Sequence, residues 1–141
     1  HTRRHLARSV YEGIAFSHKQ HLDRLLRTRD DMPECIRLAG GAANSAVWTQ
    51  MFADVTGLPV ETVRVNETGA LGCAIAAAAG VGAYASLEEA AQAMCPLGER
   101  VAPEPRRHEI YLRKHALYQK TIACLDGLWS DMQRYVENGF E

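Results

Sequence analysis

The sequence has few aromatic residues, little excess charge and no long apolar run. Aromatic residues make up 7% of its 141 residues, and the formal net charge is −1. This balance gives no general attraction to nucleic acid or to an acidic membrane, so we expect neither as a partner. The longest apolar stretch, residues 69–81, is too short to span a bilayer, and the N-terminus has no signal-peptide pattern. We therefore expect a cytoplasmic protein.

Metal-binding and disulfide patterns are lacking as well. The cysteines are widely separated, which excludes the paired spacing of a zinc ribbon; they are Cys35, Cys73, Cys95 and Cys124. We interpret them as small core residues of a reduced protein. His18 and His21 lie three residues apart but have no third ligand nearby in the sequence. The sequence therefore predicts no metal site.

Small apolar residues are abundant instead. Alanine occurs 21 times, and 47% of the residues are hydrophobic. The length suits a single domain with a core that needs no disulfide or metal. Small side chains favour helices that pack closely against a neighbour, and we expect the alanine-rich helix at 69–79 to do so.

Hydrophobic periodicity predicts helices that alternate with strands. The predicted helices are 6–26, 46–56, 69–79, 86–94 and 108–136; the predicted strands are 35–39 and 59–65; a linker with three prolines is predicted at 96–105. This order predicts an α/β layer with parallel strands. Two strands cannot cover so many helices. Either strands have been missed, or the sheet is incomplete in this chain.

Individual residues of the helices also carry predictions. The apolar stripe of the first helix, with Leu6, Val10 and Ile14, is expected to face the core. The basic residues of that helix are interpreted as a solvated face and not as a nucleic-acid site; they are Arg3, Arg4, Arg8, Lys19, Arg24 and Arg27. Trp48, Trp129 and Tyr118 are expected in the core.

The most informative feature is the turn Gly40-Gly41-Ala42-Ala43-Asn44-Ser45, between the first predicted strand and the next helix. It is neither a Walker A loop nor a GxGxxG motif. In α/β proteins ligands bind at the carboxyl ends of strands, and glycine lets a ligand approach the main chain. A helix N-terminus adds free N–H donors that suit a phosphate or a nucleotide. A tight turn without a ligand explains the two glycines equally well.

Three blocks in this sequence resemble one protein family. Residues 40–54 read GGAANSAVWTQMFAD, residues 57–60 and 67–74 read GLPV and ETGALGCA, and residues 6–16 read LARSVYEGIAF. These blocks are similar, in order, to the adenosine motif of the FGGY carbohydrate kinases and to the segments on either side of it. The resemblance runs from about residue 6 to residue 118.

The resemblance implies a fold and an activity. FGGY kinases have two domains with the actin-like, ribonuclease-H-like ATPase fold, and they transfer the γ-phosphate of ATP, bound with Mg²⁺, to a sugar hydroxyl. Residues 1–141 would be the C-terminal part of the second domain, with an adenosine-binding subregion at 35–80 and a C-terminal helical extension with a long last helix at 86–137. The sugar-binding domain and the catalytic base would lie outside this chain, so the isolated chain is expected to be inactive.

The resemblance also implies site residues. Gly40 and Gly41 would pack against the adenosine, Ala42 would contact it through its main chain, and Ser45 with Asn44 would bond the adenine or the ribose. Gly69, Ala70 and Gly72 would form a close-packed helix behind the turn. No carboxylate here matches the family's catalytic base.

Two further questions stay open at this level. The sequence is most like the pentulose branch of the family, the xylulose and L-xylulose kinases, although the sugar-recognising half is absent. A non-catalytic actin-like module for nucleotide binding or interaction is the alternative reading. The chain is expected to expose a sheet edge and an apolar face, so that it either self-associates, as in a homodimer, or needs the missing half of the protein to cover them.

Overall fold

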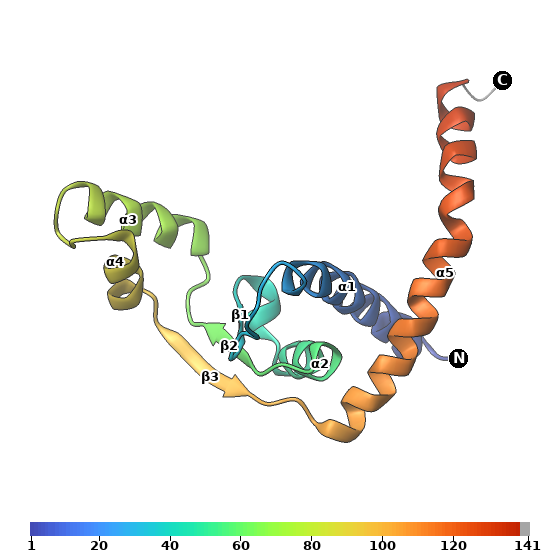
Figure 1. Cartoon of the computed structure of the whole chain (residues 1–141), viewed down its shortest axis with the longest axis horizontal. Coiled ribbons are helices and arrows are strands. Elements are labelled where there is room, and N and C mark those ends of the chain that lie inside the picture. The colour runs from blue at the N-terminus through green and yellow to red at the C-terminus, as the bar shows by residue number, and fades with distance from the viewer. Residues whose placement is uncertain (139–141) are drawn as a thin grey trace.

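The computed structural model describes residues 1–138, and its elements follow the predicted alternation closely (Figure 1). The order is α1 (Arg3–Leu26), β1 (Ile36–Leu38), the short 3-10 helix η1 (Gly41–Asn44), α2 (Ala46–Thr56), β2 (Val60–Val63), α3 (Thr68–Gly80), α4 (Leu87–Met94), β3 (Leu97–Val101) and α5 (Pro105–Glu137). No described helix is long and apolar enough to cross a membrane.

The sheet has three strands in the order β1-β2-β3. β1 and β2 are parallel, as predicted, with Ile36 opposite Val60. The predicted linker at 96–105 is wrong, because Leu97–Val101 forms β3, antiparallel to β2. Prolines flank this strand at positions 96, 103 and 105 without interrupting it, so all five of its residues keep an N–H for the ladder. The third strand still leaves a small, partial sheet.

Local signals set most helix ends. Ser45 caps α2 by accepting a hydrogen bond from the Trp48 N–H, at 3.3 Å, and Gly57 ends the helix in the left-handed conformation, at φ 77°. Ser86 caps α4 in the same way. α5 begins three residues earlier than predicted, at Pro105, because proline suits the first turn of a helix.

The core lies between the sheet, α1, α2 and the first half of α5. It consists of small and aromatic side chains, and its buried members are Ala15, Phe16, Met51, Phe52, Ala53, Val55, Val60 and Tyr111. Trp48 and Tyr118 pack against it as expected, but Trp129 is 56% exposed, so that prediction is wrong. The predicted burial of the cysteines is also wrong for Cys73 and Cys124, which are exposed.

α1 buries a different face from the one predicted. Leu6 and Val10 are 66% and 63% exposed, whereas the buried residues of the helix are Glu12, Ala15, Phe16 and Lys19. Lys19 therefore does not belong to a solvated face; its ammonium group pairs with Asp23 at 3.0 Å. α2 and α5 cover one side of α1, and no described residue range covers the apolar stripe on the other side.

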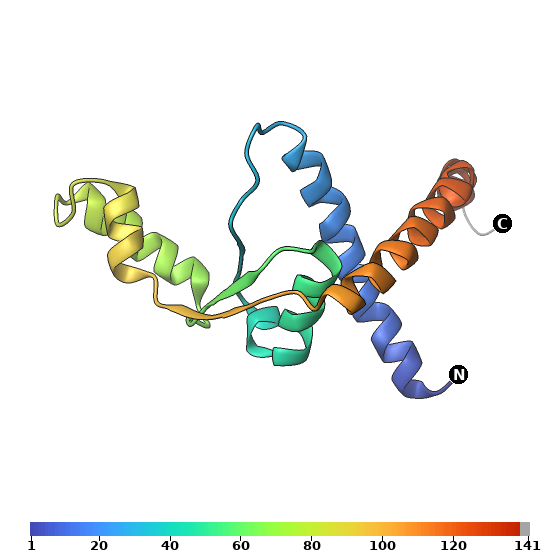
Figure 2. The same ribbon diagram turned by 60° about the horizontal axis from the view of Figure 1, so that its bottom comes forward.

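α3 and α4 form an arm beside the body. Figures 1 and 2 both show the pair at the end of the molecule opposite α5, and α3 packs against α4. No residue of α3 is buried, and a Cβ atom added to Gly69 or Gly72 would meet no atom within 4 Å. The prediction of a close-packed helix behind the glycine turn is therefore wrong for the described residues.

Candidate functional site

The glycine turn follows directly from the carboxyl end of β1. Gly40 has φ 76° and ψ −159°, a combination that only glycine adopts readily. The chain then makes one 3-10 turn, in which the Ala43 N–H donates to the Gly40 carbonyl oxygen at 3.0 Å. Ser45 completes the turn and caps α2. The sequence thus aims the N-terminus of α2 at the sheet edge where α/β proteins bind ligands.

Gly41 leaves open space on the outer side of this turn. The residue is exposed, its φ is not positive, and an added Cβ would meet no atom within 4 Å. The first N–H groups of a helix lack partners within the helix, and they carry a partial positive charge. Open main chain and free donors at one place suit the edge of a nucleotide.

The two polar side chains of the turn already make local contacts. Asn44 is exposed, and its Nδ2 donates to the Oδ1 atom of Asn66 at 3.4 Å, which ties the turn to the segment before α3. The Oγ atom of Ser45 accepts the bond that caps α2, and its hydroxyl keeps a proton to donate. The five predicted site residues, Gly40, Gly41, Ala42, Asn44 and Ser45, thus all lie in the one turn that leads into α2.

A cavity of about 520 Å³ lies beside Ser45, between the N-terminal half of α1 and the first turns of α2. Its walls include Arg4, Arg8, Tyr11 and Trp48, with the rings of Tyr11 and Trp48 edge to face at 4.9 Å. The sequence predictions did not bring these residues together. Tyr11 and Trp48 are 37 positions apart, so only the packing of α1 on α2 makes them neighbours.

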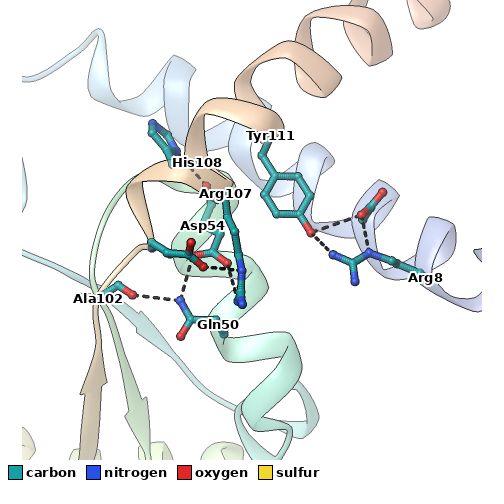
Figure 3. A network of polar contacts seen from close by, with 9 residues as sticks. Arg8, Gln50, Asp54, Ala102, Arg107, His108 and Tyr111 are labelled. Atoms are coloured by element: carbon teal, nitrogen blue, oxygen red, sulfur yellow. Dashed lines mark hydrogen bonds and ion pairs between the residues drawn. The ribbon is translucent and has the colours of Figure 1, made fainter.

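The far end of α2 is held by a buried carboxylate, that of Asp54 (Figure 3). Its side chain is 2% exposed, and its Oδ1 atom accepts hydrogen bonds from Gln50 Nε2 and from the Glu104 N–H, both at 2.8 Å. Arg107 lies 3.6 Å from its other oxygen. His108 Nδ1 donates to the Asp54 carbonyl oxygen at 2.8 Å. These contacts join α2 to the start of α5.

A second ionic cluster joins α1 to α5, and Figure 3 shows two of its side chains, Arg8 and Tyr111. The carboxylate of Glu12 accepts from Arg8 Nε at 2.8 Å, from Lys114 Nζ at 3.0 Å and from the Tyr111 hydroxyl at 3.3 Å. Burial acts to raise the pKa of Glu12, but the hydrogen bonds and charges of Arg8 and Lys114 outweigh it and hold the pKa below its usual value. Burial raises the pKa of Tyr111. Both clusters position helices.

The histidines predicted not to form a metal site lie on α1. The ring of His18 packs edge to face against Phe52, with 5.5 Å between ring centroids. Within residues 1–138, the structure brings no three His, Cys, Asp or Glu side chains together in a way that could hold a metal ion.

A glycine turn at the carboxyl end of a parallel strand, followed by a helix N-terminus, is an arrangement that many α/β proteins use to bind ligands. The comparison with known families makes this specific. The model of the FGGY family of carbohydrate kinases, C-terminal domain, matches residues 1–81, which include α1, the turn and α3. The chain belongs to this family.

Individual relatives agree with this assignment. The chain is 39% identical to the L-xylulose/3-keto-L-gulonate kinase of Escherichia coli K12 over 96% of this chain and 27% of that protein. It is 33% identical to the autoinducer-2 kinase of the same strain, over 86% of this chain and 24% of that protein. A crystal structure of xylulose kinase from Rhodospirillum rubrum matches with a TM-score of 0.76 and 28% identity, over 92% of this chain and 26% of that one.

These matches describe one part of a larger architecture. The chain spans about a quarter of the length of each of these relatives. Its fold is the distal part of an actin-like ATPase domain, with a partial three-stranded sheet and a long C-terminal helix.

Proposed function

We propose that this chain is the adenosine-binding part of an ATP-dependent carbohydrate kinase. The observation that carries the proposal is the open glycine turn at the carboxyl end of β1, in a chain that belongs to the FGGY family. Phosphoryl transfer depends mainly on positioning and on charge neutralisation, so a turn that holds the nucleotide in line with the acceptor contributes to the rate without a chemical step of its own.

Each residue of the turn has a proposed role. Gly40 and Gly41 pack against the adenosine, and Ala42 contacts it through its main chain. Ser45 has a hydroxyl proton free to donate to the adenine or the ribose, and Asn44 adds a second polar group once it leaves Asn66. The turn fits this ligand because no side chain fills the space beside Gly41.

The Mg²⁺ that accompanies ATP is held by the phosphates and by the part of the kinase outside this chain. Residues 1–138 bring no three metal-ligating side chains together. We propose that the catalytic base, too, belongs to the part of the kinase outside this chain. We propose the adenosine-binding subregion at 35–80 and the C-terminal helical extension, which includes β3, at 86–137. The isolated chain has no kinase activity.

The proposed acceptor is a pentulose such as xylulose. Two of the relatives, an L-xylulose/3-keto-L-gulonate kinase and a probable L-xylulose kinase, support this choice. A cytoplasmic location remains the prediction for the whole kinase.

Gly41→Val in the kinase that contains this chain tests the proposal. The substitution fits the fold, because Gly41 is exposed, with a negative φ and open space beside it. We expect KM for ATP to rise by at least about tenfold, the effect of losing roughly 1.4 kcal/mol of nucleotide binding, and KM for the pentulose to stay within about twofold.

Gly127→Val is the matched control, because Gly127 lies on α5, outside the adenosine-binding subregion, and also faces open space. It should leave both KM values unchanged. Unchanged ATP kinetics in Gly41→Val would remove the turn from the nucleotide site. Nucleotide binding by the whole protein without turnover of any sugar in a pentulose panel would replace the kinase with the non-catalytic module.

A further inference from the structure

The loops that follow β1 and β2 lie at the same edge of the sheet. The two strands are parallel neighbours, with Leu38 opposite Thr62 near their carboxyl ends. The first loop carries the glycine turn, and the second loop, residues 64–67, leads through Asn66 to the start of α3. In α/β proteins ligands bind at this edge, between loops of this kind. The site residues predicted from the sequence all come from the first loop.

Asn66 connects the second loop to the turn. Its Oδ1 atom accepts a hydrogen bond from Asn44 Nδ2 at 3.4 Å, and both side chains are exposed. An amide oxygen has two lone pairs, and an amide nitrogen has two hydrogens. Among the described residues, the second lone pair and both Nδ2 hydrogens of Asn66 remain free, whether Asn44 keeps its bond or turns to the nucleotide. Asn66 therefore presents a donor and an acceptor side by side.

The surroundings of Asn66 are open and carry no net charge. An added Cβ at Gly69, three residues further along, would meet no atom within 4 Å, as at Gly41. Arg64 and Glu67 flank Asn66 in the chain, and their charges are opposite. Phosphates bind where positive charge is concentrated, so this position suits the neutral base of the nucleotide better than its phosphates.

A carboxamide matches adenine and not guanine. Adenine presents the acceptor N7 beside the donor N6 amino group, so the donor and the acceptor of an asparagine form two hydrogen bonds with it at once. Guanine presents two acceptors, N7 and O6, on the same edge. One of the two contacts to guanine would then bring two acceptor oxygens together. The carboxamide therefore discriminates between the two purines by chemistry alone.

We propose that Asn66 is a specificity-determining residue of the nucleotide site, and that its carboxamide binds the N6–N7 edge of adenine and selects ATP over GTP. This inference rests on the proposed function of the turn. Gly40 and Gly41 hold the adenosine from the β1 side, and Asn66 reads the base from the β2 side. The bond from Asn44 holds the Asn66 oxygen toward the turn before the nucleotide arrives.

Isothermal titration calorimetry of the whole kinase, without the sugar, tests this with ATP and with 7-deaza-ATP, in which a C–H group replaces N7. We expect the wild type to bind 7-deaza-ATP about fivefold more weakly than ATP, the effect of one lost hydrogen bond. Asn66→Ala loses both bonds and should bind ATP at least about tenfold more weakly. Its Kd values for the two nucleotides should be equal, because the group that distinguishes them is gone.

Two further variants complete the experiment. A lysine side chain donates to N7 and O6 of guanine, so Asn66→Lys should shift the ratio of the KM values for ATP and GTP toward GTP, by at least about tenfold. The exposed position accommodates the longer side chain. Asn138→Ala is the matched control, because it removes an exposed carboxamide at the end of α5. It should leave every Kd and KM unchanged.

Two results would overturn the proposal. One is a wild type that binds ATP and 7-deaza-ATP equally well, and the other is an Asn66→Ala protein that keeps the wild-type ratio of the two Kd values. If Gly41→Val weakens ATP binding and Asn66→Ala does not, the turn stays the nucleotide site and Asn66 alone is removed from it. If Gly41→Val also leaves ATP binding unchanged, the proposed function fails, and this inference fails with it.

Discussion

Gly57 and His108 provide a sharp test of how α2 is joined to α5. Gly57 ends α2 with φ 77°, and a Cβ atom added there would lie 2.5 Å from His108 Cε1 and 2.8 Å from its Nε2. Gly57→Ala therefore forces the imidazole away. The ring cannot move without losing the hydrogen bond from its Nδ1 to the Asp54 carbonyl oxygen.

Two contributions set the expected loss of unfolding free energy in Gly57→Ala. A left-handed conformation costs an alanine about 1 kcal/mol, and the broken hydrogen bond costs about 1 kcal/mol more. We expect Gly57→Ala to lower the free energy of unfolding by about 2 to 3 kcal/mol when imperfect repacking of the ring is included. Gly82 is the matched control, since it has φ 76° but nothing within 4 Å, so Gly82→Ala should cost about 1 kcal/mol.

Urea unfolding followed by circular dichroism measures these differences, and a double-mutant cycle isolates the cause. In a His108→Ala background the clash is gone, so Gly57→Ala should cost about 1 kcal/mol, like the control. A coupling energy of zero between the two positions would refute the reasoning. Equal losses for Gly57→Ala and Gly82→Ala would do the same.

The ionisable residues between α1 and α5 make two further predictions. Glu12→Gln should lower the free energy of unfolding by about 2 kcal/mol at pH 7. The loss is small for a broken ionic cluster because the partners Arg8 and Lys114 are half-exposed. Burial first, and then the charge of Lys19, lowers the pKa of His115 from 6.5. Below pH 6.5 the unfolded chain takes up the proton before the folded one, so stability should fall with acidification, and His115→Phe should flatten that fall.

Thermal unfolding between about pH 3 and pH 8 checks both substitutions. The contribution of Glu12 is present above its unfolded pKa of about 4.5 and is lost as the pH falls through the lower folded value, so Glu12→Gln should be least harmful in acid. A Glu12→Gln protein as stable as the wild type at pH 7 would contradict the ionic role. An unchanged pH slope in His115→Phe would assign the acid sensitivity to other groups.

The sequence predicts the ends of helices well where a capping residue acts on its immediate neighbours in the chain. Ser45 and Gly57 bracket α2 because a capping hydroxyl and a left-handed glycine act within one turn of the chain. The sequence does not predict β3, because the prolines around it are typical of a linker, whereas its pairing with β2 joins residues 34 positions apart, Val63 and Leu97. Burial of α1 was assigned to the wrong face, because Glu12 and Lys19 become buried only with their ionic partners in place.

The candidate site divides in the same way. The turn at 40–45 could be identified from the sequence alone. Two glycines between a strand and a helix act through backbone conformation, and the family resemblance lies in consecutive residues. The cavity beside Ser45 and the clusters at Asp54 and Glu12 could not, because they join residues of α1, α2 and α5 that are distant in sequence.

The sequence by itself determined the α/β order, the helix caps, the glycine turn and the family, because each depends on short-range geometry or on residues that follow one another. The tertiary structure alone decided which faces are buried. It placed α3 on an arm, buried Glu12 and Asp54 as helix anchors, and left apolar residues in the second half of α5 exposed, such as Trp129 and Met132. An apolar pattern indicates that a helix face can be buried, but only the arrangement of the neighbouring helices decides whether that face is covered.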